Sequence, residues 1–332
     1  MGTRYSAAVV RVDAGGKPRF CRAYGVLRSG AGAPPAYPDT RFDIASLTKI
    51  FVSTVALALV EAGRLALDAP LAGHIVEWRG TPHEPITLRM ILAHVGGFRS
   101  GADYRTLLDC NVETFALSAP LAGVPGAGVV YSDLGFIALG VLLARSSGTS
   151  LARLVQATLR GFGARTAGYE VPAPERRRVA ATERDAWRGL VQGAAHDEKA
   201  YLMNGVAGHA GLFADAADVA RAGEWYLGAV HGRPSPLRAE LARSAVAEAA
   251  FDPVLRRGLG WALKTTDENS CGARMSRSAF GHTGFTGTSI WLDPERDAGV
   301  VLLTNAVHFG RGDLRATRAA VCDAAVAALD GG

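Results

Sequence analysis

Strand-like segments stand at both ends of this chain, and helical patterns fill the long part between them. The N-terminal segments, residues 5–12 and 20–27, flank the turn Ala14-Gly15-Gly16. Short apolar segments return after residue 257, at 259–264, 278–283, 288–292 and 299–304, before a closing helix predicted over about 313–329. Strands from both ends can join one sheet only if the chain returns on itself, so the pattern predicts an α/β sheet domain with a helical region inserted.

The boundaries of this division follow from where the pattern changes. We expect residues 1–70 and 251–332 to form the sheet domain, and residues 71–250 to form a mainly helical region. A Pro-rich, charged stretch at 171–188 is expected to be a surface loop. With 332 residues, of which 48% are hydrophobic, the chain can bury a sizeable core.

Charge and cysteine content argue against several classes of protein. The formal net charge of +5 is mild, because 36 Lys and Arg residues are accompanied by 31 Asp and Glu residues. The basic runs 176–178 and 256–257 are therefore typical of solvated surface, and we expect no nucleic-acid partner. The four cysteines form no C-x-x-C pair, which argues against a zinc site or a disulfide framework. The sequence shows neither a leader segment nor a run of roughly 18 apolar residues, so it predicts a cytoplasmic protein without a membrane partner.

The first chemical motif is Ser46-Leu47-Thr48-Lys49, at the start of an apolar helix that ends near Gly63. Residues three apart share one face of a helix, so the Lys49 amine can reach the Ser46 hydroxyl and activate it as a nucleophile. Asp43 precedes the helix as a candidate cap. At a helix N-terminus the backbone N–H of Ser46 can also hold a developing oxyanion. An ordinary capped helix with one exposed lysine is the alternative.

Two further elements follow along the chain. Tyr131-Ser132-Asp133 precedes a helix, and a tyrosine beside a lysine can act as general base or acid, although a buried structural tyrosine is the alternative. His282-Thr283-Gly284 ends a strand in a glycine-rich turn, where free N–H groups can bind an acyl oxygen. Taken alone, His282 is more typical of a structural histidine.

Taken in order, these three elements resemble the motif series of the serine β-lactamase and penicillin-binding-protein superfamily, and most closely its class C-like and esterase branch. Other similar segments are 86–97, 125–140, 205–213, 258–261 and 300–305. The resemblance spans roughly residues 5–329. It implies an antiparallel β-sheet flanked by helices, with an inserted all-α region that forms one wall of the active-site cleft.

The resemblance also implies roles for single residues. Ser46 is expected to be the nucleophile, Lys49 its activator, and Tyr131 the general base and acid. The oxyanion hole is expected from the backbone N–H groups of Ser46 and Phe285. The residues expected to bind substrate are Asp133, His282, Thr283, Gly284 and Phe285. No metal and no cofactor are implied.

Two departures from the motif series bear on the substrate. His282 stands where lactamases and transpeptidases usually have a lysine, which weakens the case for a substrate that carries a carboxylate. Asp133 stands where asparagine is usual, and an ionised aspartate cannot donate to a substrate carbonyl. An ionised Asp133 would favour a protonated Lys49. We hypothesise that Asp133 faces an amine or hydroxyl on the substrate or acyl acceptor.

Several histidines need separate interpretations. His196-Asp197-Glu198 and His209 invite a metal site, but they lack a helical i, i+4 ligand pair, so structural or substrate-lining roles are favoured. His94 is expected at a helix C-terminus before Gly96-Gly97, where a positively charged imidazolium is favourable.

The sequence therefore predicts an enzyme that transfers acyl groups through a Ser46 acyl-enzyme formed from a small-molecule carboxylic ester or activated amide. Hydrolysis by an esterase is the default. The alternatives are a transacylase that passes the acyl group to an amine or hydroxyl acceptor, a β-lactamase or peptidase, and a sensor domain that is acylated once without turnover.

Overall fold

One antiparallel sheet joins the two ends of the chain in the computed structural model, which describes residues 5–251, 253 and 256–331. The strand order is β2-β1-β11-β10-β9-β8-β7, and each neighbouring pair is antiparallel. The strands are β1 (Ala7–Ala14), β2 (Lys17–Gly25), β7 (Arg256–Arg257), β8 (Ala262–Leu263), β9 (Phe280–Thr283), β10 (Ser289–Asp293) and β11 (Ala298–Thr304). Val9 of β1 lies opposite Leu303 of β11. The predicted sheet, antiparallel and shared by both ends, is confirmed.

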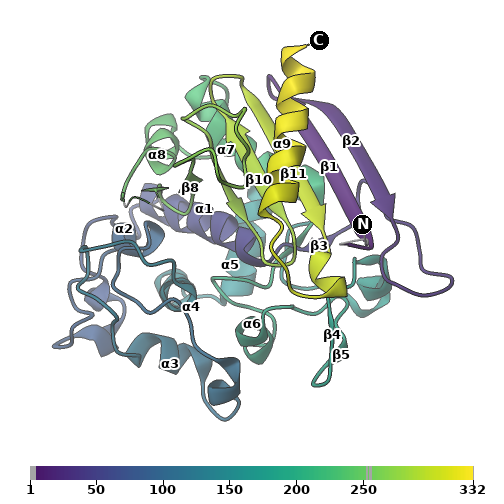
Figure 1. The fold of residues 1–332 in the computed structure, drawn as a ribbon. Coiled ribbons are helices and arrows are strands. Elements are labelled where there is room, and N and C mark those ends of the chain that lie inside the picture. The colour runs from purple at the N-terminus through teal and green to yellow at the C-terminus, as the bar shows by residue number, and fades with distance from the viewer. Residues whose placement is uncertain (1–4, 252, 254–255, 332) are drawn as a thin grey trace.

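Helices cover both faces of this sheet. The two covering helices are α7 (Ala216–Val230) and α9 (Arg315–Asp330) (Figure 1). Because side chains alternate along a strand, Ile290 and Leu292 pack in the main core with α7, while Trp291 packs in the smaller core with α9. Gly223 lets α7 approach closely, since a Cβ there would lie 2.7 Å from side-chain atoms of Ile290 and Leu292. With both faces covered, β11 is buried along its whole length.

A helical layer lies on the other side of α7. Its members are α1 (Thr48–Glu61), α2 (Leu88–Leu92), α3 (Val112–Ser118), α4 (Asp133–Ser147), α5 (Leu151–Gly161), α6 (Glu198–Leu202) and α8 (Ala239–Ala245). α1 is apolar on all sides and crosses the centre of the molecule, where it contacts α4 and α5 (Figure 1). At Gly260, with φ of +82°, the chain passes so close to α1 that a Cβ would overlap Ser53 Oγ.

Most of the predicted elements lie where the sequence places them. The first helix begins as a short 3-10 turn, Ala45–Leu47. The sequence pattern predicts helices at 132–145, 216–227 and about 313–329, and α4, α7 and α9 begin and end within three residues of these bounds. The small strand pairs β3 (Phe42–Asp43) with β6 (Phe213–Ala214), and β4 (Arg184–Asp185) with β5 (Gly189–Leu190), were not predicted. The β4–β5 hairpin begins inside the stretch predicted as a loop. α7 falls within the predicted helical region and packs on the sheet, so the proposed domain boundaries remain a prediction.

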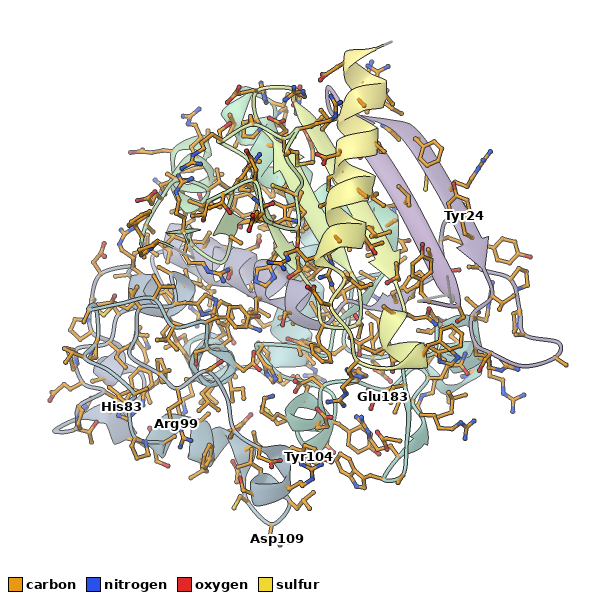
Figure 2. All side chains as sticks on the ribbon, in the orientation of Figure 1. Tyr24, His83, Arg99, Tyr104, Asp109 and Glu183 are labelled. Carbon is orange, nitrogen blue, oxygen red and sulfur yellow. The ribbon has the colours of Figure 1, made fainter. Side chains whose placement is uncertain are left out.

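The outer edge of the sheet is open. β2 is the last strand, and its Tyr24 side chain points away from the molecule (Figure 2). Across the described residues, no single helix is long and apolar enough to cross a membrane. Only α4 and α5 taken together, which meet at 80°, reach the length and composition of such a span.

Candidate active site

Ser46 lies in the 3-10 turn that leads into α1. The residue before it, Ala45, has φ of +46°, a left-handed conformation that costs about 1–2 kcal/mol for a residue with a Cβ. The buried carboxylate of Asp43 holds this turn, because its Oδ1 accepts the Ala45 N–H at 2.8 Å. Asp43 thus does not cap α1 as expected but fixes the backbone just before Ser46.

Lys49 uses all three of its ammonium protons within the site. Its Nζ lies 3.1 Å from Ser46 Oγ, 2.9 Å from Asp133 Oδ1 and 3.1 Å from the carbonyl oxygen of His209. The side chain is fully buried. Burial is the largest single influence and lowers the pKa of Lys49, but the Asp133 carboxylate and the interactions with Tyr131 together outweigh it, so the pKa is raised above that of an ordinary lysine. Lys49 is therefore an ammonium group that donates to the serine oxygen.

Asp133 is the first residue of α4 and bridges two lysines. Its other oxygen lies 3.3 Å from Lys199 Nζ, which also binds Asp197 at 3.1 Å. Burial raises the pKa of Asp133, but the charges of Lys49, His209 and Lys199 together lower it more, so this carboxylate is ionised. The expectation of an ionised Asp133 beside a protonated Lys49 agrees with these pKa directions.

A second carboxylate extends this charged cluster. Asp197 Oδ1 lies 2.8 Å from His209 Nε2, and ligand atoms of Asp133, Asp197 and His209 lie within 4.8 Å of one another, close enough to hold a metal ion. The Lys199 ammonium lies against both carboxylates and supplies positive charge there. Of the other residues of this motif, His196 binds Glu183 at 2.8 Å and Glu198 pairs with Arg311.

Two cations lie close to the ring of Tyr131. Lys49 Nζ is 4.8 Å from the centroid of its ring, and the Arg257 guanidinium is 5.2 Å away. The prediction that Arg257 is solvated surface is wrong, since only 6% of the residue is exposed. Sequence reasoning missed Arg257 because two adjacent arginines carry no signal that one of them turns inward.

His94 packs its ring against Tyr131, with 4.6 Å between the ring centroids. It follows α2, as expected, but the predicted imidazolium is wrong. His94 is buried, and its Nδ1 accepts the Ser132 N–H at 3.1 Å, which requires a neutral ring. Burial and the nearby charge of Arg257 lower the pKa of His94 well below its usual range. The neutral ring anchors Ser132, whose hydroxyl caps α4.

His282 is buried near the end of β9. Its Nδ1–H donates to the Thr283 carbonyl at 2.8 Å, while Nε2 has no hydrogen-bond partner within the described ranges. Burial lowers the pKa of His282 to about 3, and the charges of Arg257 and Lys49 contribute to this lowering. His282 is therefore a neutral group at physiological pH, so the positive charge on this side of Tyr131 comes from Arg257.

The predicted residues meet at one cavity of about 730 Å³. Ser46, Tyr131, His282, Thr283 and Phe285 all line it, together with Arg256, Arg257 and Arg315. Lys49 and Asp133 lie behind Ser46, connected to it by hydrogen bonds. Gly284 lies between the cavity-lining residues Thr283 and Phe285, so the structure brings all eight predicted residues to one place. Sequence reasoning missed Lys199, although it directly follows the His196-Asp197-Glu198 segment, because its contact with Asp133 joins residues that are distant along the chain.

Many solved structures share this fold, including the following two. EstCE1, described as a hydrolase with promiscuous acyltransferase activity, gives a TM-score of 0.77 at 19% identity, with 97% of this chain and 94% of that chain covered. A class C β-lactamase from Rhodobacter sphaeroides gives a TM-score of 0.76 at 21% identity, covering 99% and 95%. The fold is therefore that of the β-lactamase-like serine hydrolases and acyltransferases.

The sequence matches the family described as Beta-lactamase over residues 2–324. It is also 30% identical over 308 residues to the "Putative D-alanyl-D-alanine carboxypeptidase" of Escherichia coli K12, covering 82% of this chain and 70% of that protein. The chain thus belongs to the Beta-lactamase family and is an enzyme of its serine hydrolase and acyltransferase class.

Proposed function

We propose that this protein is a serine esterase that works through an acyl-enzyme on Ser46. The observation that carries the proposal is the 3.1 Å contact of Ser46 Oγ with the buried Lys49 ammonium, in a cavity that Tyr131 also lines. The substrate is a small carboxylic ester or activated amide. The nucleophile, its activator and the general base are Ser46, Lys49 and Tyr131.

Proton transfer in this mechanism runs through Tyr131. Lys49 already carries its proton, so the group proposed to take the Ser46 proton is Tyr131. As Ser46 Oγ bonds to the acyl carbon, the bond to the leaving oxygen breaks and that oxygen takes the proton from Tyr131. Water then gives its proton to Tyr131 and attacks the acyl carbon, and Ser46 leaves with the proton restored. The Lys49 and Arg257 cations near the ring stabilise negative charge that develops on Tyr131 during these steps.

Developing charge on the acyl oxygen is held by the backbone N–H groups of Ser46 and Phe285. The Phe285 N–H has no acceptor among the residues the structure describes and follows Gly284 in the turn after β9. Its free donor at the edge of the cavity supports this role.

The acyl acceptor is water by default, and an amine or hydroxyl acceptor would make the protein a transacylase. The acyltransferase activity in the description of EstCE1 supports keeping this alternative. Asp133 was proposed to face such an acceptor. Because its two oxygens already bind Lys49 and Lys199, an acceptor amine at Asp133 would share these oxygens with the two lysines. We retain the predicted cytoplasmic location as part of this proposal.

A second candidate is a peptidase for substrates that end in a carboxylate, as the name of the Escherichia coli relative suggests. His282, at a position where lactamases and transpeptidases usually have a lysine, argues against this candidate. The guanidinium of Arg257 lines the same cavity and supplies a fixed positive charge, which favours this candidate.

Intact mass spectrometry tests these assignments. Wild type and Ser46→Ala are incubated with 4-nitrophenyl butyrate, with a β-lactam, with a D-alanyl-D-alanine peptide, and with the ester plus an amine. We expect a butyryl adduct on wild type only, released as butyrate with turnover. Wild-type turnover by Ser46→Ala would defeat the mechanism. A stoichiometric adduct without release would support the sensor, an amide product the transacylase, and release of D-alanine from a D-alanyl-D-alanine peptide the peptidase.

A further inference from the structure

The turn after β9 is hydrogen-bonded to the segment that precedes Ser46. Thr286 Oγ1 donates to the Asp43 carbonyl at 2.8 Å, and Thr288 Oγ1 donates to the Ile44 carbonyl at 3.1 Å. Gly284 also lies so close to this segment that a Cβ would overlap the Ile44 carbonyl oxygen. The two backbone donors proposed for the oxyanion hole, in Ser46 and Phe285, are therefore held in one rigid unit.

A buried arginine lies behind this turn. Arg318, on α9, is only 8% exposed, and its Nη2 donates to the Gly284 carbonyl at 2.7 Å. Its Nε has no hydrogen-bond partner, and no carboxylate pairs with the guanidinium, in the part of the chain that the structure describes. Burial lowers the pKa of Arg318 to about 10, although the more distant charge of Asp313 opposes this.

The Gly284 carbonyl and the Phe285 N–H belong to one peptide group. In a trans peptide the C=O and N–H bonds point in opposite directions within a plane. A donor that fixes the carbonyl from behind thus fixes the direction of the N–H on the cavity side. A positive charge at the carbonyl oxygen also draws electrons from the peptide nitrogen, which strengthens the N–H as a donor.

From this contact we infer that Arg318 is a positioning residue for acyl transfer, which orients and polarises the Gly284–Phe285 peptide so that the Phe285 N–H stabilises the oxyanion. The inference rests on the proposed function, in which that N–H is half of the oxyanion hole. Arg318 does not touch the substrate and acts only through the peptide.

A role in holding the turn does not account for this arginine. The Gly287 N–H already donates to the same Gly284 carbonyl at 3.1 Å and closes the turn without it. Burying a cation that has no carboxylate partner destabilises a fold, so a neutral side chain of similar length would serve packing better. What only a cation supplies is polarisation of the peptide.

The test compares Arg318→Met, which keeps length and removes charge, with Arg318→Lys, which keeps the charge. Arg153→Met, at an exposed position of α5, is the matched control. For each variant, kcat and KM are measured with 4-nitrophenyl butyrate, and the inhibition constant is measured with phenylboronic acid. The boronic acid forms a tetrahedral adduct with an active serine and places an oxygen where the oxyanion forms.

We expect Arg318→Met to lower kcat by at least about tenfold with little change in KM, and to weaken boronic acid binding by a similar factor. Arg318→Lys should recover part of both losses, and Arg153→Met should match wild type. A folded Arg318→Met variant with wild-type kcat would overturn the inference. So would a loss of kcat without a loss of boronic acid affinity.

A second measurement needs no substrate and keeps the two proposals distinguishable. In protein labelled with ¹⁵N-phenylalanine, the Phe285 amide resonance should shift in Arg318→Met and shift less in Arg318→Lys. An unchanged resonance would contradict the role of Arg318 even if Ser46 is the nucleophile. If wild type and Ser46→Ala bind boronic acid equally, the proposed function fails, and the amide shift still decides whether Arg318 polarises this peptide.

Discussion

The Asp133 carboxylate forms ion pairs with two lysines. One of them, Lys49, contacts Ser46, so the charge of Asp133 favours the protonated form of Lys49. The raised pKa of Lys49 means that this ion pair stabilises the fold below the pKa of an unfolded lysine, and that the stabilisation is lost as the pH rises through the higher folded pKa. An asparagine at this position keeps an oxygen acceptor and loses the charge. Burial would then dominate and lower the pKa of Lys49.

We therefore expect Asp133→Asn to move the alkaline limb of the pH profile of kcat/KM for an ester to lower pH, and to reduce the free energy of unfolding by about 1–3 kcal/mol. Urea unfolding and the pH profile measure the two effects. Asp68→Asn is the control, because its ion pair with Arg89 is exposed and worth at most about 1 kcal/mol. An unshifted alkaline limb would mean that Asp133 does not hold the charge of Lys49.

Acid stability should depend on Glu183, a half-buried carboxylate shown in Figure 2. A hydrogen bond from His196 is the main cause that lowers the pKa of Glu183 to about 2, with Arg311 contributing. A lowered folded pKa gives stability that is complete above the pKa of an unfolded glutamate, about 4.3, and is lost as the pH falls toward 2. In Glu183→Gln, the free energy of unfolding should fall less steeply than in wild type between pH 5 and pH 2. The difference between the two slopes should be about that of one proton taken up on unfolding. Identical slopes in urea titrations of the two proteins would contradict this.

The residues of the site differ in whether a short sequence motif marks them or only long-range contacts place them. Ser46, Lys49, Tyr131 and His282 could be predicted, because each lies in a short motif whose spacing has a chemical meaning. Lys199 and Arg257 could not be predicted, since their roles depend on contacts between elements that are distant along the chain. The charge of His94 was predicted wrongly because burial, which the sequence does not give at a helix end, outweighs the helix dipole.

Among the elements, long periodic helices were predictable and two-residue strands were not. α1 and α7 have enough turns for an apolar pattern to emerge, whereas β3 and β6 are too short to show a period. These short pairs form only because larger elements bring their backbones together. The β4–β5 hairpin went undetected because its proline-rich, charged surroundings favour a loop.

The close approach of the chain to α1 at Gly260 leads to a prediction about stability. Gly260→Ala should destabilise the protein by about 2–4 kcal/mol, because φ is positive there and the added Cβ overlaps Ser53. Gly63→Ala separates the two causes, since Gly63 has φ of +67° with nothing near its Cβ position, and it should cost only about 1–2 kcal/mol. Thermal and urea unfolding measure both. Equal losses in the two variants would show that the crossing tolerates the extra atom.

For the whole molecule, one hydrophobic core runs without a break from the sheet into the helical layer. Leu303 of β11 and Leu139 of α4 are both fully buried members of it. Although two regions were predicted from the sequence, we expect them to unfold together. Leu303→Ala and Leu139→Ala should each reduce stability by about 2–5 kcal/mol, and Leu108→Ala, at an exposed position, by much less.

Far-UV circular dichroism and tryptophan fluorescence should report the same unfolding midpoint in each of these variants. Two separate transitions, with Leu303→Ala shifting one and Leu139→Ala the other, would instead support independent domains along the predicted boundaries.

The pairing of β1 with β11 also bears on the order in which the molecule is made. During synthesis β1 leaves the ribosome long before β11, its central partner in the sheet, because nearly all of the other elements lie between these two strands along the chain. Ser46 emerges long before the turn after β9, to which its segment is fastened. If Ser46 is the nucleophile and Phe285 supplies part of the oxyanion hole, as proposed, a nascent chain carries the first without the second, and acyl transfer can begin only after the last strands have joined the first.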